Sequence, residues 1–229
     1  QKLYLTNMDK DIMLFVIGSE KLEKGLNIIG AHIDSPRLDV KQNPLYESDG
    51  LAYLDTHYYG GIKKYQWLAM PLALHGVIVK RDGDTVEVSI GEAEDDPVLC
   101  ITDLLPHLAG EQMNKNASKF VDGEALNILI GSQPEGGAED GETKENPVKR
   151  AVLSVLKRDW GVEEEDFISA ELEAVPAGRA RDAGLDRSMI LGYGHDDRVC
   201  AYAELKAILD IETPEKTAIC ILADKEEIG

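Results

Sequence analysis

Three short acidic segments, each placed directly after an apolar run, constrain the fold of this 229-residue chain more than any other feature. We expect each apolar run to form a strand and each acidic segment to begin where that strand ends. Open α/β sheets place their functional sites at the carboxyl ends of the strands, so the three segments should converge. The segments are GAHIDSP at 30–36, GHDDRV at 194–199 and ADKEEIG at 223–229.

The three segments together supply one imidazole and several carboxylates. Histidine offers a neutral nitrogen ligand, and carboxylates offer oxygen ligands that also neutralise the charge of a cation. Such a mixture at one edge of a sheet suits a pair of divalent metal ions. The candidate residues are His32, Asp34, Asp196, Asp197, Glu226 and Glu227.

The adjacent Glu226 and Glu227 suit a division of labour, in which one binds metal and the other takes a proton from an attacking water. Asp34 follows His32 by two residues on the expected strand, so it points the same way and can orient a catalytic group. Each pattern also has an ordinary interpretation, because such pairs are common in turns and at solvated helix starts. Their joint placement, each after a strand that we expect to be buried, favours the metal site.

The remaining histidines have simpler interpretations. His57 and His75 lie in apolar segments with a strand pattern, which favours structural roles. His107 reads as a loop residue from the pattern alone, and His195 is a ligand candidate that nothing else in the sequence supports.

The elements around the acidic segments predict a parallel α/β domain. The helix expected at 198–211 has apolar residues at the spacing of a helix that faces a sheet. These apolar residues are Val199, Ala203, Ala207 and Ile208. The expected strands are 3–5, 11–17, 26–30, 189–192 and 218–222.

From about residue 41 the pattern becomes β-rich and antiparallel. Residues 51–59 alternate, 67–79 form a long apolar stretch, and Arg81-Asp82-Gly83-Asp84 is a hairpin signal before a return strand at 85–90. A short amphipathic helix is expected at 151–158 and a strand at 167–175. We therefore expect an α/β domain at 1–42, a β-rich insert at 43–187 and the rest of the α/β domain at 188–229.

The charge and the cysteines exclude several classes of function. A net charge of −19 argues against nucleic acid and anionic membranes as partners. No apolar run approaches the roughly 20 residues that span a bilayer. The three cysteines are widely separated and lack CxxC spacing, so we expect reduced thiols in a cytoplasmic protein.

Five strings carry a resemblance to a known family. GAHIDSPRLDVK, THYYGGIKKYQWLAMPLALHGVIV, DLLPHLA, GHDDRVCAYAELKAI and ADKEEIG occur in this order along nearly the whole chain. Together they resemble the bacterial branch of the aspartyl aminopeptidase family of dinuclear zinc exopeptidases. The resemblance implies a three-layer α/β/α catalytic domain interrupted by a β-rich inserted dimerisation domain.

The resemblance also assigns roles to the acidic segments. It implies His32 as a ligand of one metal ion, Asp196 as the carboxylate that bridges both ions, and Glu227 as a terminal ligand. Glu226 would be the general base, and Asp34 would orient the site. The cofactor would be two divalent ions, Zn²⁺ first, with Co²⁺ or Mn²⁺ as alternatives.

Further features follow from the same resemblance. The peptide bond between Asp196 and Asp197 would be cis. A histidine of the insert, for which His107 is the candidate, would reach the active site of a neighbouring subunit. The insert would drive formation of a homo-oligomer, with a dodecamer as the expected assembly.

Two features depart from the family pattern. Several relatives have a leucine before the bridging aspartate, where this chain has Gly194-His195. The family also supplies a further Asp and a His as metal ligands beyond Gly229, and this chain opens with QKLYLTN instead of Met. We therefore expect an internal fragment that is a poor catalyst alone.

The expected function is a metallo-aminopeptidase that hydrolyses N-terminal residues, acidic or neutral, from peptides with a water activated by two metal ions. One alternative is a related metallo-exopeptidase or deacylase, against which THYYGG and the long insert argue. The other is a non-catalytic oligomeric scaffold with a vestigial site, which should purify without stoichiometric zinc.

Overall fold

The computed structural model describes residues 1–136 and 145–228. The chain divides into two compact units. The first unit consists of Gln1–Pro36 together with Ala180–Gly229, and the second unit is Arg37–Arg179. The first unit is thus built from two segments that the second separates in the sequence. A role of the middle segment in dimerisation stays a prediction.

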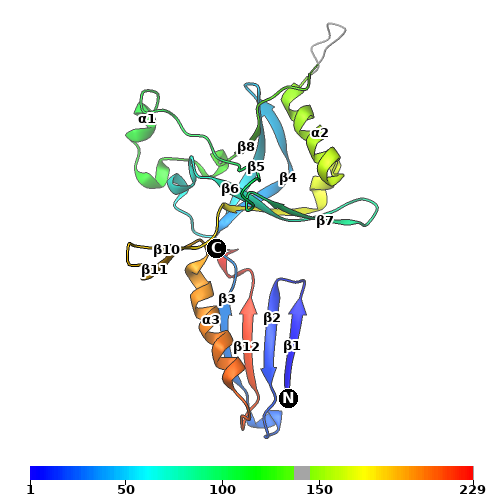
Figure 1. Ribbon diagram of the computed structural model, residues 1–229, viewed down its shortest axis with the longest axis vertical. Helices are drawn as coiled ribbons and strands as arrows, with labels where there is room; N and C mark the ends of the chain where they lie inside the picture. Colours follow the sequence, from blue (N-terminus) through cyan, green and yellow to red (C-terminus); the bar gives the residue numbers. More distant parts are fainter. Residues whose placement is uncertain (137–144, 229) are drawn as a thin grey trace. The chain divides into compact units, whose positions relative to one another are not determined.

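The first unit contains a four-stranded sheet in the order β1-β2-β12-β3 (Figure 1). Only β12 and β3 are parallel, whereas β2 pairs antiparallel with both β1 and β12. The prediction of a parallel sheet was therefore wrong for β1 and β2. The strands are β1 (Lys2–Asn7), β2 (Asp11–Val16), β3 (Asn27–His32) and β12 (Ala218–Ala223).

A tight turn explains the antiparallel start of this sheet. Met8 and Asp9 have φ values of 53° and 56°, and the N–H of Lys10 donates to the carbonyl of Asn7 at 3.0 Å. Two successive positive φ angles are the signature of the type I′ turns that join antiparallel strands. Met-Asp is not the Asn-Gly or Asp-Gly pair that usually indicates such a turn, so this turn was not predictable from the sequence.

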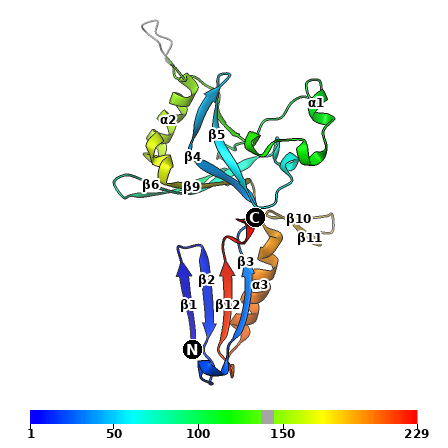
Figure 2. The same cartoon turned by 180° about the vertical axis from the view of Figure 1, so that it is seen from behind.

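Helix α3 (His195–Asp210) packs against one face of this sheet, as the two opposite views show (Figure 2). The buried residues of α3 are Ala201 and Ile208. Of the four apolar residues predicted to face the sheet, only Ile208 is buried, so the prediction was wrong for the other three. Val199 is 63% exposed. The buried stripe includes the half-buried Glu204, which hides its apolar character from a hydrophobicity pattern. The three-layer arrangement stays a proposal.

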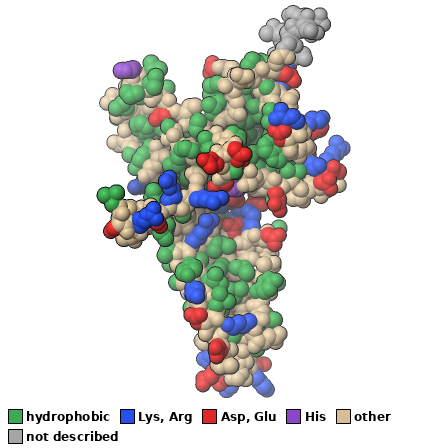
Figure 3. All heavy atoms as spheres, viewed as in Figure 1, with side chains coloured by type: hydrophobic (Ala, Val, Ile, Leu, Met, Phe, Trp, Pro, Cys, Tyr) green, Lys and Arg blue, Asp and Glu red, His purple; other side chains and the backbone are tan. Residues whose placement is uncertain are grey.

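The core of the first unit is small. Its buried residues are Val16, Ala201, Ile208, Ala218, Cys220 and Leu222. Hydrophobic side chains also lie at the surface over the strands, as the space-filling view shows (Figure 3). In the unit as a whole, exposed large hydrophobic residues of the strands include Leu3, Leu5, Ile28 and Ile29. The expectation that the strand before His32 is buried is therefore wrong for Ile28, which is 58% exposed.

The strand before the second acidic segment lies outside the main sheet. Strands β10 (Arg181–Ala183) and β11 (Met189–Leu191) form a separate two-stranded antiparallel ribbon. The three residues of β11 are apolar, and they are 60–72% exposed. The expectation that GHDDRV follows a buried sheet strand was therefore wrong, because this short apolar run pairs with its own neighbour through a turn at Gly184–Arg187.

The second unit is built on a six-stranded sheet in the order β7-β6-β9-β4-β5-β8, in which every pair is antiparallel. The β-rich antiparallel pattern and the hairpin at 81–84 are thus confirmed. The strands are β4 (Arg37–Ser48), β5 (Leu51–Tyr59), β6 (Leu72–Val79), β7 (Thr85–Ile90), β8 (Ile128–Gly131) and β9 (Ala170–Pro176).

Helix α2 (Pro147–Trp160) is longer than the predicted 151–158. Proline at its first position is already suited to a helix, and Gly161 ends it with a left-handed φ of 65°. The shorter helical elements are α1 (Gly110–Met113) and the 3₁₀ turns Leu22–Lys24, Lys64–Trp67, Ala117–Lys119, Gly123–Ala125, Glu164–Ser169 and Glu226–Ile228.

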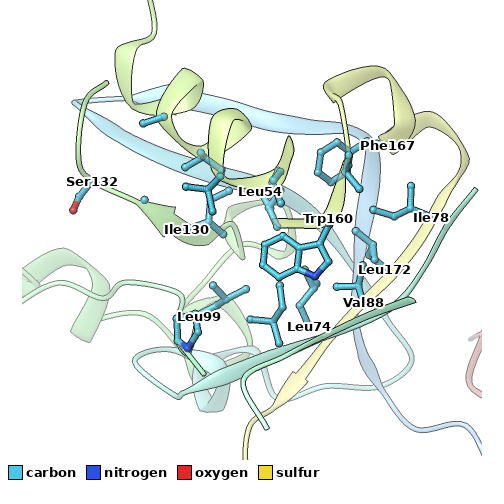
Figure 4. A pocket seen from close by; sticks show the side chains of 18 of the residues that line it. Leu54, Leu74, Ile78, Val88, Leu99, Ile130, Ser132, Trp160, Phe167 and Leu172 are labelled. Carbon is cyan, nitrogen blue, oxygen red and sulfur yellow. The ribbon is translucent and has the colours of Figure 1, made fainter. Parts of the chain in front are cut away.

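The core of the second unit lies between its sheet and α2, and a partly open cavity of about 340 Å³ adjoins it (Figure 4). Trp160, at the end of α2, contributes to the lining together with strand residues such as Leu74 and Leu172. Ser132 and Gln133 are the polar lining residues. The cavity belongs to the apolar core of this unit and carries no charged side chain in its lining.

Candidate metal centre

The first and third acidic segments meet because β3 and β12 are parallel neighbours. His32 is the last residue of β3 and lies opposite Ala223, the last residue of β12. The ladder continues one step further, since the N–H of Ile33 donates to the carbonyl of Ala223 at 2.9 Å. Glu226 and Glu227 follow in a 3₁₀ turn. The geometry expected from strand ends therefore holds for these two segments.

Side-chain ligand atoms of His32, Glu226 and Glu227 lie within 4.8 Å of one another. His32 Nε2 lies 3.9 Å from Glu226 Oε2 and 3.3 Å from Asp196 Oδ1. The side chains of Asp196 and Glu226 are 86% and 63% exposed, so solvent and small molecules reach them. The structure thus brings His32, Asp196, Glu226 and Glu227 together.

Asp34 supports this cluster from a buried position. Its side chain is fully buried, with Oδ1 3.3 Å from Nδ1 of His32. Its Oδ2 accepts a hydrogen bond of 3.0 Å from the backbone N–H of Glu227. One carboxylate therefore contacts both segments that contribute to the cluster.

The orientation of His32 leaves Nε2 available as a ligand. Its Nδ1 lies 3.0 Å from the carbonyl oxygen of Asp34. A carbonyl can only accept a hydrogen bond, so Nδ1 carries the proton and the lone pair of Nε2 faces Asp196 and Glu226. A backbone carbonyl or carboxylate on the far nitrogen is the usual arrangement for a metal-binding histidine.

The carboxylates around His32 also affect its pKa. Burial lowers this pKa, but the hydrogen bond to the Asp34 carbonyl and the charges of Glu226, Asp34 and Asp197 raise it by more. The net pKa lies above the usual value of 6.5. The cluster therefore favours a positive charge at the position of the imidazole, as expected where carboxylates converge.

The second acidic segment reaches the cluster by a loop instead of a sheet strand. Asp196 and Asp197 are non-helical residues at the start of α3, and the peptide bond between them is cis, as the resemblance implied. The carbonyl of Asp196 accepts a hydrogen bond of 3.1 Å from the hydroxyl of Ser35. Tyr193 donates from its hydroxyl to the carbonyl of Pro36 at 2.7 Å. These bonds tie the segment to the chain that follows His32.

Sequence reasoning missed the role of Ser35, although Ser35 lies inside the GAHIDSP motif. It is 5% exposed and also lies against Gly194, where an added Cβ would be 3.2 Å from its hydroxyl oxygen. Gly194 has a φ of 80°, which favours glycine. The sequence signal for the contact between Ser35 and Asp196 was only a small polar residue directly after Asp34.

The other histidines are placed as follows. His195 is not part of the cluster, since its Nε2 lies 3.2 Å from the carbonyl of Ile190. His107 is an exposed turn residue of the second unit. His57 and His75 pair with carboxylates of the second unit, which agrees with structural roles: His57 with Glu124 at 3.2 Å, and His75 with Glu92 at 3.0 Å.

The donor set fits zinc. Zinc takes histidine nitrogen and carboxylate oxygen ligands at about 2.0–2.2 Å in a tetrahedral arrangement, which places neighbouring ligand atoms roughly 3.4 Å apart. The separation between the two ligand candidates His32 and Asp196 is 3.3 Å, from Nε2 to Oδ1. Glu227, the third ligand candidate, is held by Asp34, which accepts a hydrogen bond from the backbone N–H of Glu227. The cluster therefore needs little rearrangement to hold an ion.

Comparison with known proteins decides the family. The sequence pattern of the family described as "Aminopeptidase I zinc metalloprotease (M18)" matches residues 1–229. The chain belongs to the M18 family. A probable M18 family aminopeptidase 1 of Clostridium acetobutylicum is 58% identical over 228 residues, which is 100% of this chain and 48% of the relative.

Solved M18 structures show the same fold. A crystal structure of the M18 aminopeptidase from Thermotoga maritima superposes with a TM-score of 0.91 at 49% identity and covers 100% of this chain and 49% of that one. The mApe1 dodecamer of S. cerevesiae has a TM-score of 0.68 at 22% identity over 99% of this chain and 50% of its own, a likeness of fold alone. The chain thus spans about half the length of the curated relatives it matches. Within the described residues, the helices are all too short or too polar to cross a membrane.

Proposed function

We propose that the full-length protein is a zinc-dependent aminopeptidase that removes the N-terminal residue from peptides. The observation that carries this proposal is the convergence of His32, Asp196, Glu226 and Glu227 at the ends of β3 and β12 and the start of α3. Membership of a zinc metalloprotease family supports the choice of zinc over cobalt or manganese.

His32, Asp196 and Glu227 would hold the two zinc ions. When bound, the ions supply Lewis-acid polarisation of the scissile carbonyl and lower the pKa of the attacking water. Asp34 keeps the imidazole of His32 in the orientation described above. It contacts the ring from a fully buried position, so it acts through His32 and not on the substrate.

Glu226 is the proposed general base. Its carboxylate lies beside His32 and is 63% exposed, so it can reach both a water and a bound peptide. It would accept the proton of the attacking water and deliver it to the departing amine. One carboxylate then serves as base and as acid in turn, and the site needs no other proton carrier for peptide hydrolysis.

The proposed substrates are peptides with a free α-amino group, whose positive charge suits an acidic site. The first residue would be acidic or neutral. Arg37, the first basic residue after GAHIDSP, is not available to bind an acidic side chain. Its Nε lies 2.8 Å from Asp39 and its Nη2 lies 3.1 Å from Glu173.

The second unit is proposed to act in assembly. It would be the β-rich inserted dimerisation domain of a homo-oligomer, and the yeast dodecamer suggests the form of that assembly. The exposed His107 would then reach the active site of a neighbouring subunit. The first unit would form part of a three-layer α/β/α catalytic domain.

The function is tested with full-length protein supplied with zinc and a panel of aminoacyl substrates, each offered with a free and with an acetylated amino group. We expect release of the first residue from free substrates only. Glu226→Gln should abolish turnover, whereas Glu212→Gln, the same exchange at an exposed residue after α3, should not. Hydrolysis of acetylated substrates would instead favour the deacylase, and no turnover at all would favour the scaffold.

The role of His107 has its own test. His107→Gln should lower turnover while the size of the assembly on a gel-filtration column stays unchanged. Turnover should return when His107→Gln is mixed and reassembled with Glu226→Gln, because some sites would then receive an intact histidine from the neighbour. No restoration would contradict a site shared between subunits.

A further inference from the structure

Asp11, a residue that the proposed mechanism does not use, contacts the turn that carries Glu226 and Glu227. Its Oδ1 accepts a hydrogen bond of 2.7 Å from the backbone N–H of Asp224. Its Oδ2 accepts a second hydrogen bond, of 2.8 Å, from the side-chain amide of Asn7. Asp224 is the first residue after β12, and the two glutamates follow it by two and three positions.

The mixed pairing of the sheet puts Asp11 at this place. Strand β2 runs antiparallel to β12, with Ile12 opposite Leu222, so the first residue of β2 lies beside the carboxyl end of β12. In a parallel sheet the first residue of β2 would lie at the opposite end. The antiparallel hairpin thus brings a carboxylate to the edge where the metal cluster lies.

The turn after β12 is therefore held on both sides. Asp11, from β2, accepts the N–H of Asp224 at its beginning, and Asp34, after β3, accepts the N–H of Glu227. Strand β12 lies between β2 and β3 in the sheet, so the two carboxylates flank it.

The turn needs such support. Lys225 has a φ of 73°, in a region that side-chain-bearing residues rarely adopt. The 3₁₀ turn that follows has only the three residues Glu226–Ile228. So short an element does not fix its own orientation by internal hydrogen bonds, and contacts from the neighbouring strands must do so.

We infer that Asp11 is a positioning residue that fixes the turn from Asp224 to Glu227 and so holds the proposed base and metal ligand in place. The role of Glu226 as a base rests on the proposed function, but the effect of Asp11 on metal binding does not. Partners that bond directly to a metal ligand typically change metal affinity or activity by about 10–100-fold when they are replaced. Asp11 bonds the turn three residues before Glu227, so we expect its effect at the lower end of that range.

The ionisation of Asp11 agrees with this role. The hydrogen bond from the Asp224 N–H, followed by that from Asn7, lowers the pKa of Asp11 below its usual 3.8. The group is a carboxylate at neutral pH, and a carboxylate accepts a stronger hydrogen bond from a backbone N–H than a neutral acceptor does.

The test compares Asp11→Ala, Asp11→Asn and Asn7→Ala in full-length protein. Zinc affinity is measured by chelator competition. Steady-state kinetics on the best substrate give kcat and KM, and calorimetry gives Tm. Asp11→Ala should weaken zinc binding and lower kcat by about tenfold with little change in KM. Asp11→Asn keeps one acceptor oxygen and should recover part of the loss. Asn7→Ala removes only the contact to the other oxygen and should stay within about threefold of wild type.

A lower Tm with unchanged zinc affinity and unchanged kcat in Asp11→Ala would overturn the inference and leave Asp11 a purely structural residue. If Asp11→Ala does not fold, Asp11→Asn decides by the same two measurements. A full-length protein that binds zinc but hydrolyses no peptide would contradict the proposed function alone, because the zinc affinities would still test Asp11.

Discussion

Asp34 Oδ2 accepts a 3.0 Å hydrogen bond from the backbone N–H of Glu227. The other oxygen of Asp34 lies 3.3 Å from the ring of His32, so one buried carboxylate joins residues that are 195 positions apart in the sequence. The link crosses from β3 to the turn after β12. It makes the relative position of two proposed metal ligands depend on one side chain.

Replacing Asp34 by Asn should therefore weaken metal binding. The amide keeps one acceptor oxygen, so it can face either Glu227 or His32 but cannot accept from both. We expect a loss of about 10–100-fold in zinc affinity, measured by chelator competition on folded protein. Asp39→Asn, another aspartate close by in the sequence, is the matched control. Equal zinc affinity in Asp34→Asn and wild type would contradict the assigned role.

The position of this site was predictable in part. The apolar runs before His32 and Glu227 indicated two strands, and the side chains meet because these strands are adjacent and parallel in the structure. Asp196 was assigned by motif, but the path to it was not predictable, because β11 pairs with β10 in a ribbon outside the sheet. Asp11 had no signal, since its place depends on the antiparallel direction of β2.

A prediction of pH dependence follows from Asp96. Its Oδ2 accepts backbone N–H groups of Ala93, Gly91 and Glu92 at 3.0–3.1 Å. The hydrogen bond from Ala93 is the largest cause that lowers the pKa of Asp96 below 3.8; burial, the next largest cause, opposes it, and the hydrogen bonds from Gly91 and Glu92 lower this pKa further. A lowered pKa in the folded state stabilises the fold above the unfolded pKa, and this stability is lost as pH falls through the folded value.

Asp96→Ala should therefore unfold more readily than wild type at pH 7, and the difference should shrink as pH falls below about 4. Chemical denaturation of both proteins between pH 3 and 7 measures this. Asp95→Ala, at the adjacent exposed aspartate, controls for loss of charge. A difference between Asp96→Ala and wild type that stays constant over the whole range would show that ionisation of Asp96 is not involved.

Gly76 in β6 is predicted to be irreplaceable. It has a φ of 138°, and an added Cβ would lie 1.9 Å from the carbonyl oxygen of Glu171 on the paired strand β9. Gly76→Ala should lower the free energy of unfolding by at least about 3 kcal/mol, because backbone would have to move. Gly61→Ala meets open space and should change it by less than about 1 kcal/mol. Similar unfolding midpoints for the two variants would contradict this account.

The cavity in the second unit should make Leu172 costly to truncate. Leu172 is 3% exposed and lines a space that already holds about 340 Å³ (Figure 4). Leu172→Ala enlarges this space and should cost about 2–5 kcal/mol of stability, as large-to-small core substitutions do. Leu104→Ala, at a residue 53% exposed, should cost less than about 1 kcal/mol. Denaturant unfolding measures the free energy of unfolding of both variants. Equal losses of stability in the two variants would contradict this prediction.

Secondary structure in the second unit was more predictable than the packing of the first. Alternation identified β5, and a hairpin signal with alternation identified β7, because successive side chains in these strands differ in burial. Strand β6 was indicated by a long apolar stretch, and its first three residues are all buried. In the first unit, α3 buries Ala201 and Ile208, with the half-buried Glu204 between them. A helix face that mixes small and acidic residues does not give the apolar periodicity on which the prediction relied.

The measurement that tests the central claim most directly is the zinc content and turnover of full-length Glu226→Gln beside wild type. The account predicts that both proteins bind zinc with the same stoichiometry, because His32, Asp196 and Glu227 are intact. It predicts that wild type releases N-terminal residues and that the variant loses at least about 100-fold in kcat, the scale of general-base catalysis. A variant that binds zinc and retains wild-type turnover would contradict the assignment of Glu226 as the base.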